Sequence, residues 1–111
     1  MAIYITQGRY TSDAVKGMVA NPKNREKAVA DLMEKAGAKL LGLYFTFGEY
    51  DFLSISEAPN AEVMASALIA GAASGGVSDL RTSVAMTSKD IIEAFRLAGL
   101  QAARAVTKGL E

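Results

Sequence analysis

Four segments of the 111-residue chain alternate between apolar and polar residues, and this pattern constrains the fold more than any other feature. The segments are 2–9, 39–47, 50–57 and 80–86. A period of two is typical of strands that bury one face. Stretches with helical spacing of apolar residues, 25–36 and 60–74, separate the first strand from the second and the third from the fourth. This order predicts an α+β, ferredoxin-like βαββαβ sandwich, with a four-stranded antiparallel sheet and both helices on one face.

Capping residues predict where the helices begin and end. Asn21-Pro22 offers a second helix start, so we expect the first helical region to be broken there. Gly37 is expected to end the first main helix, and Asn60 to begin the next one. The run Thr87 to Asp90 resembles a capping box that opens a C-terminal helix. The expected division is a domain over residues 1–98 and a helical extension over 99–111.

The chain contains neither cysteine nor histidine. Disulfides, thiolate or histidine metal sites, a Cys-His dyad and a Ser-His-Asp triad are therefore excluded within one chain, and we expect no cofactor and no metal. Twelve basic residues balance twelve acidic ones, which argues against a nucleic-acid partner. A formal net charge of zero leaves little repulsion between copies, so we expect a homo-oligomer.

The sequence also shows no segment that would direct the chain to a membrane. Its first residues enter a strand-like pattern without a basic segment followed by a long apolar one, so no secretion signal is expected. The longest uncharged stretch, between Glu62 and Asp79, is rich in Ala, Gly and Ser and shorter than the about 20 residues that span a bilayer. We expect a cytoplasmic protein without a membrane partner.

The alternation divides the expected sheet into two faces. The more aliphatic face is expected under the helices and would hold Ile3, Ile5, Leu41, Leu43, Phe45, Leu53, Ile55, Val84 and Met86. The other face would hold Tyr4, Thr6, Tyr44, Thr46, Phe52, Ser54, Arg81 and Ser83. This second face is too apolar for a purely solvated surface. We expect a second copy to cover it, sheet against sheet, as in a dimeric α/β barrel; the alternative is that the C-terminal helix folds back over it.

The predicted hairpin resembles the GYD domain family. The likeness rests on the run Gly42 to Phe52 and on Ile55-Ser56-Glu57-Ala58-Pro59, with Gly48-Glu49-Tyr50-Asp51 as the motif that gives the family its name. It extends from Tyr4 to the helix of Phe95. The resemblance implies a ferredoxin-like, dimeric α/β-barrel fold and no established biochemical activity.

The motif supplies Tyr50 and Asp51 as candidate catalytic residues. Strand parity places Asp51 on the same face as Leu53, where an unpaired carboxylate is costly. Asp51 is interpreted either as an acid/base or ligand-orienting group, or as a turn residue that accepts backbone N–H bonds, and the second interpretation is favoured. Tyr50 is either a pocket hydroxyl or, as we favour, an aromatic residue that packs in the hairpin.

Tyr4, Tyr44 and Arg81 are candidate ligand-binding residues. Arg81 could hold a carboxylate or phosphate, or pair with Asp79 or with an acid of a second copy. Tyr4 and Tyr44 are expected to flank one another on adjacent strands, where they would line a cleft or stabilise the sheet and its interface.

Three functions follow as hypotheses. The leading one is a homo-oligomeric module of unknown function that binds a small organic ligand in a cleft between sheet and helices. The second is a cofactor-independent monooxygenase or isomerase of the dimeric α/β-barrel type, in which Asp51, Tyr50 or Arg81 polarises a substrate; it rests on fold analogy. The third is a structural module in which the C-terminal helix joins dimers into larger assemblies.

Overall fold

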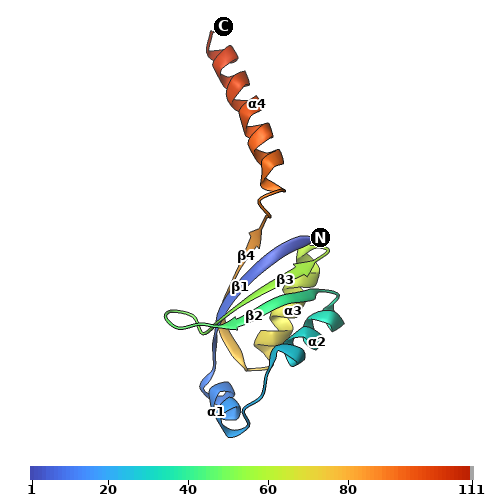
Figure 1. Cartoon of the computed structure of the whole chain (residues 1–111), viewed down its shortest axis with the longest axis vertical. Coiled ribbons are helices and arrows are strands. Elements are labelled where there is room, and N and C mark those ends of the chain that lie inside the picture. Colours follow the sequence, from blue (N-terminus) through green and yellow to red (C-terminus); the bar gives the residue numbers. More distant parts are fainter. Residues whose placement is uncertain (111) are drawn as a thin grey trace.

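The computed structural model describes residues 1–110, with side chains to residue 105, and its elements follow the predicted order. The strands are β1 (Ala2–Tyr10), β2 (Lys39–Phe45), β3 (Phe52–Ala58) and β4 (Val77–Ala85). The helices are α1 (Ser12–Ala20), α2 (Glu26–Ala36), α3 (Ala61–Ala73) and α4 (Ile91–Leu110). The strands form one antiparallel sheet in the order β2-β3-β1-β4, and α2 and α3 cover one of its faces (Figure 1). The α+β, ferredoxin-like fold is therefore confirmed.

Local signals fixed the helix ends correctly at three positions. Gly37 ends α2 in the left-handed conformation, with φ of 92°. The Asn60 side chain accepts the Val63 N–H at 2.9 Å and begins α3. The Thr87 hydroxyl accepts the Asp90 N–H at 3.0 Å just before α4. The two side-chain bonds satisfy backbone N–H groups that have no partner within a helix.

The first helical region is broken as predicted, but its second half starts later than predicted. The first part, α1, ends at Ala20, and α2 begins at Glu26 instead of at Asn21-Pro22. The Asn24 side chain accepts the Glu26 N–H at 2.9 Å, so a later asparagine supplies the local bond at this start. Arg25 is the N-cap residue of α2.

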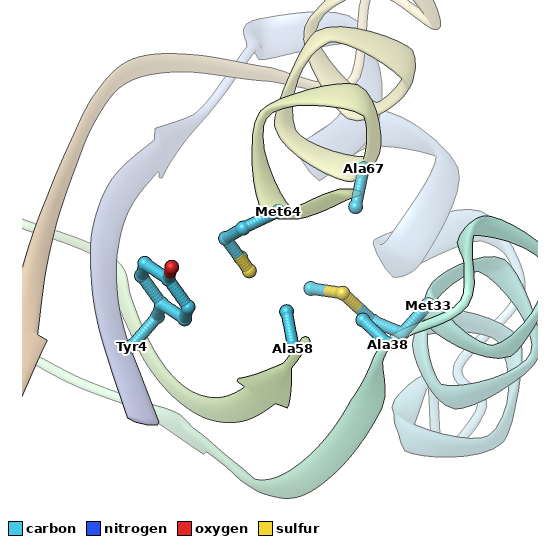
Figure 2. Close-up of a cluster of buried hydrophobic side chains, with 6 residues drawn as sticks. All are labelled: Tyr4, Met33, Ala38, Ala58, Met64 and Ala67. Carbon is cyan, nitrogen blue, oxygen red and sulfur yellow. The ribbon is translucent and has the colours of Figure 1, made fainter. Parts of the chain in front are cut away.

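The core lies between the sheet and the two helices that cover it. Figure 2 shows its buried cluster, which consists of Tyr4, Met33, Ala38, Ala58, Met64 and Ala67. Ala58 and Met64 are 0% and 1% exposed, and Tyr4 is 7% exposed. Small alanines beside two flexible thioethers allow α2 and α3 to lie close to the sheet.

The prediction of which sheet face lies under the helices is wrong for β1 and β3. The covered face carries Tyr4, Thr6, Phe52 and Ser54, all of them buried. Residues of the other parity, Ile3, Ile5, Leu53 and Ile55, lie on the uncovered face. Both faces are apolar enough to need a cover, and alternation alone does not tell which one the helices take.

For the outer strands β2 and β4, the predicted faces are correct at some positions and the predicted burial is wrong at others. Leu43 and Phe45 pair with Ser54 and Phe52 and therefore lie on the covered face, as expected. The registers also place Tyr44, Arg81 and Ser83 on the uncovered face, as expected. Leu41 falls at an irregularity between Leu40 and Gly42, and Thr46 follows the end of β2. Four apolar residues expected in the core are exposed, namely Leu41, Phe45, Val84 and Met86.

The C-terminal helix α4 projects away from the sheet beyond the end of β4 (Figure 1). It does not fold back over the uncovered face, so that alternative is wrong. The molecule is accordingly long and narrow, at 70 × 29 × 22 Å. The expected domain boundary at residue 98 falls within α4 and stays a prediction, and residue 111 of the expected extension lies outside the described residues.

Candidate functional site

A cavity of about 100 Å³ lies between the sheet and the helices α2 and α3. The sheet contributes Thr6, Leu43, Phe52, Ser54, Val77 and Leu80 to its wall, the helices contribute Val29, Leu32, Met33, Ala67, Leu68 and Gly71, and Tyr10 adds an aromatic ring. The lining is almost wholly apolar. The cavity is partly open to solvent, and its size and apolar lining would suit a small apolar molecule.

Tyr10 lies within a group of aromatic side chains at this cavity. Its ring centroid is 5.0 Å from that of Phe52 and 5.4 Å from that of Phe45. Burial raises the pKa of the Tyr10 phenol; the positive charge of Arg25 opposes that rise, and the negative charge of Asp51 adds to it. The phenol is therefore protonated at neutral pH and can donate a hydrogen bond.

Hydroxyl groups lie on the covered face of the sheet. The Thr6 and Thr82 side-chain oxygens are 3.0 Å apart and share a hydrogen bond. Ser54, which lines the cavity, is 3% exposed. The Ser56 hydroxyl is buried and has no hydrogen-bond partner among the described residues. The sheet therefore offers small polar groups beneath an otherwise apolar space.

Asp51 ties the β2–β3 hairpin to the end of β1. Its Oδ2 accepts the Tyr10 N–H at 2.9 Å, and its own N–H donates to the Gly8 carbonyl at 2.8 Å. The Thr46 N–H donates to the Asp51 carbonyl at 2.8 Å and closes the hairpin. These contacts give the motif aspartate the backbone-binding role that the sequence favoured, while its catalytic role stays a prediction.

Tyr50 lies near two arginines. The guanidinium carbons of Arg9 and Arg81 are each 5.8 Å from the centre of its ring, within the range of a cation–π interaction. Arg9 also donates through Nε to the Glu49 carbonyl at 2.8 Å and lies 3.7 Å from Asp79 Oδ2. Asp79, a predicted partner of Arg81, is thus within ion-pair distance of Arg9.

These five residues, together with Leu80, line a second, polar hollow of about 340 Å³ at the hairpin. Asp79 adopts a left-handed backbone conformation with φ of 52°, which is uncommon for a residue other than glycine. Two guanidinium groups and two carboxylates leave this hollow without a net charge.

The structure brings only some of the predicted site residues together. Tyr50 and Arg81 are neighbours at the hairpin, and Tyr44 shares the uncovered face with Arg81 and is 60% exposed. Tyr4 lies on the opposite face, beneath the helices. The expected pairing of Tyr4 with Tyr44 is wrong, because β3 separates β1 from β2 in the sheet.

Sequence reasoning missed Tyr10, which lines the cavity, and Arg25, whose charge acts on the pKa of the Tyr10 phenol. Tyr10 has the same strand parity as Tyr4 and Thr6, which is a signal that could have placed it on their face. Arg25 carried no such signal, because its position depends on where α2 begins.

Among residues 1–110, no group of three or more acidic, cysteine or histidine side chains is arranged to hold a metal ion. No helix in that part of the chain is long and apolar enough to cross a membrane.

Residues 4–95 match the GYD domain over most of the chain, including the hairpin just described. The chain belongs to the GYD domain family. The resemblance seen in its sequence is thereby confirmed. One similar protein comes from Thermus thermophilus and is named a glutamine synthetase and cystathionine beta-lyase binding protein. It is 28% identical over 92 residues, which cover 83% of this chain and 96% of that protein.

Solved structures support the fold of this GYD domain. The crystal structure of a Thermus thermophilus protein superposes with a TM-score of 0.51 at 17% identity, covering 79% of this chain and 96% of that one. The crystal structure of MtbAldR gives a TM-score of 0.56 at 13% identity, over 78% of this chain and 52% of that one. The structure of FFRP-DM1 gives 0.51 at 13% identity, over 78% of this chain and all of that one. At these identities the likeness concerns the fold alone.

Proposed function

We propose that this GYD-domain protein is a homodimeric module that binds a small, mainly apolar molecule in the cavity between its sheet and helices. The observation that carries the proposal is the apolar cavity of about 100 Å³, walled by both layers of the fold. An apolar cavity of about 150 Å³ in a protein core stays dry and accepts benzene or xenon. The smaller cavity here fits a ligand of fewer carbon atoms.

The uncovered sheet face supports the homodimer. Ile3, Ile5, Leu53 and Ile55 form its centre, with the exposed Tyr44 beside them. An antiparallel sheet that faces water normally carries polar residues on that side. A second copy, packed face to face at the usual sheet spacing of about 10 Å, would remove these aliphatic side chains from water.

A matched pair of variants in α3 tests the cavity. Ala67 is 3% exposed and lines the cavity, whereas Ala70 lies on the exposed side of the same helix. Ala67→Val should fill part of the cavity and abolish binding of xenon or isobutanol, followed by NMR titration. Ala70→Val carries the same loss of helix propensity and should bind as the wild type does. A wild-type protein that binds neither probe would refute the proposal.

A second pair of variants tests the dimer. Ile55→Lys places a charge at the centre of the uncovered face, so light scattering after size exclusion should show a monomer with an unchanged circular dichroism spectrum. Val15→Lys, at a residue of α1 that is 45% exposed, should leave the dimer intact. A monomeric wild type at micromolar concentration would contradict this part of the proposal.

One observation favours a second candidate function, that of a protein-binding or assembly module. Ile92, Phe95, Leu97 and Leu100 of the projecting helix α4 are between 44% and 67% exposed. In proteins most helical stability comes from the packing of an apolar face, so a helix that exposes these side chains would gain from a partner. The name of the Thermus relative, a binding protein for two enzymes, is compatible with such a role. The monooxygenase or isomerase hypothesis and the cytoplasmic location stay predictions.

A further inference from the structure

Ser54 offers the cavity a hydroxyl that no other group in the described part of the chain uses. Its side chain lines the cavity from β3, and the residue is only 3% exposed. It makes no side-chain hydrogen bond with any residue that the structure describes. A hydroxyl has one donor and two acceptor positions, and leaving them unpaired away from water is costly. Ser54 is therefore suited to a polar atom that enters the cavity from outside the chain.

Thr6 stands directly opposite Ser54 on the neighbouring strand. The register of β1 and β3 pairs the two residues, and both of them line the cavity. The side chains of such a pair start from Cβ atoms about 5 Å apart. On its other side Thr6 pairs with Thr82 of β4, and the side-chain oxygens of these two threonines are 3.0 Å apart. Whichever threonine donates this bond, the Thr6 oxygen keeps a lone pair for a further donor.

The rest of the cavity wall restricts the ligand to an uncharged molecule. Among the described residues, no lysine, arginine, aspartate or glutamate lines the cavity. An ionised group would therefore be removed from water without an opposite charge beside it, which is costly. One polar atom next to Ser54 and Thr6 is compatible with this wall, and the remainder of the ligand should be hydrocarbon. Compared with the six carbons of benzene in about 150 Å³, a volume of about 100 Å³ suits roughly four carbon atoms.

We propose that the ligand of this cavity is a short, uncharged aliphatic alcohol, whose hydroxyl accepts a hydrogen bond from Ser54 and donates one to Thr6. This inference rests on the proposed function and names the class of its ligand. An alcohol can make both bonds, because its oxygen carries a donor and two acceptor positions. A ketone of the same size only accepts, so it would leave the free lone pair of Thr6 without a donor.

The test compares 2-butanol with 2-butanone, which has the same carbon skeleton and no hydroxyl donor, and with xenon, which forms no hydrogen bond. NMR titration of the full-length protein should give a higher affinity for the alcohol than for the ketone. Ser54→Ala should weaken 2-butanol binding about two- to tenfold and leave xenon binding at least as strong as in the wild type. Ser56→Ala is the matched control, because Ser56 is a second buried serine on the same face of β3 but lies outside the cavity wall. Its affinities for both probes should equal those of the wild type.

Three results separate the two levels of the proposal. A wild type that binds 2-butanone as tightly as 2-butanol, or that binds xenon alone, would overturn the alcohol inference and leave the proposed cavity function in place. A folded Ser54→Ala protein that keeps the wild-type affinity for 2-butanol, or that loses xenon binding as well, would also overturn it, because Ser54 would then not recognise the hydroxyl. If Ser54→Ala does not fold, the comparison of alcohol and ketone in the wild type decides alone. If the wild type binds xenon, isobutanol, 2-butanol and 2-butanone all undetectably, both the inference and the proposed function fail.

Discussion

Removal of the Asp51 carboxylate should loosen the hairpin from β1. In Asp51→Ala the half-buried Tyr10 N–H loses its acceptor at 2.9 Å. A hydrogen bond to a charged group contributes about 1.5–3 kcal/mol to the free energy of unfolding. With a urea m-value of about 1.5 kcal/mol/M, typical of a small domain, the unfolding midpoint should fall by about 1–2 M.

Two further variants make this measurement specific. Asp51→Asn keeps a side-chain oxygen that can accept the same N–H, so its midpoint should lie between those of the wild type and Asp51→Ala. Asp31→Ala removes an exposed carboxylate that pairs with Lys27 at 3.1 Å one helical turn away. Such a pair contributes about 0.5 kcal/mol or less, so this control should unfold close to the wild type. All proteins are compared at one concentration, because association shifts apparent stability.

A midpoint of Asp51→Ala no lower than that of Asp31→Ala would refute the structural role of the motif aspartate. The Asp51 carboxylate would then not stabilise the fold, and the acid/base interpretation would better explain its place in the hairpin.

Three other predictions concern packing, the C-terminal helix and pH. An added Cβ at Gly8 would stand 2.7 Å from the side chains of Leu80 and Phe52, so Gly8→Ala should lower the free energy of unfolding by about 1–3 kcal/mol. Gly17 lies in open space within α1, so Gly17→Ala should raise it by up to about 1 kcal/mol. Thermal unfolding of both variants measures these changes, and a Gly8→Ala protein as stable as the wild type would contradict the tight packing. Truncation after Ala98 should leave the domain folded by circular dichroism and reduce any assembly larger than a dimer in light scattering; an unfolded product would show that α4 supports the domain. Because the pKa of Tyr10 is raised in the folded protein, its contribution to stability is complete below the ordinary pKa of 10.0 and is lost as pH rises through the pKa of the folded state. Any stability advantage of the wild type over Tyr10→Phe in denaturant titrations should therefore shrink above about pH 10. A difference that does not change with pH would contradict the raised pKa.

Features that depend on neighbours in the chain were determined by the sequence. The helix caps at Gly37 and Asn60 were predicted because each is a bond or a backbone conformation within a few residues. The element order, the hairpin and the GYD motif were equally local, since a turn between two alternating segments leaves few ways to connect them. Strand alternation also grouped Ile3 with Ile5, and Tyr4 with Thr6, correctly.

Only the tertiary structure decided which of those groups the helices cover. Alternation with a period of two states which residues share a face, but the side on which the connecting helices pack is a property of the whole sheet. Tyr4 therefore became a core residue and left Tyr44 on the other side. The effect of the Arg25 charge on the pKa of Tyr10 was equally beyond the sequence, because it links the end of β1 to the start of α2, and no local pattern specifies that link.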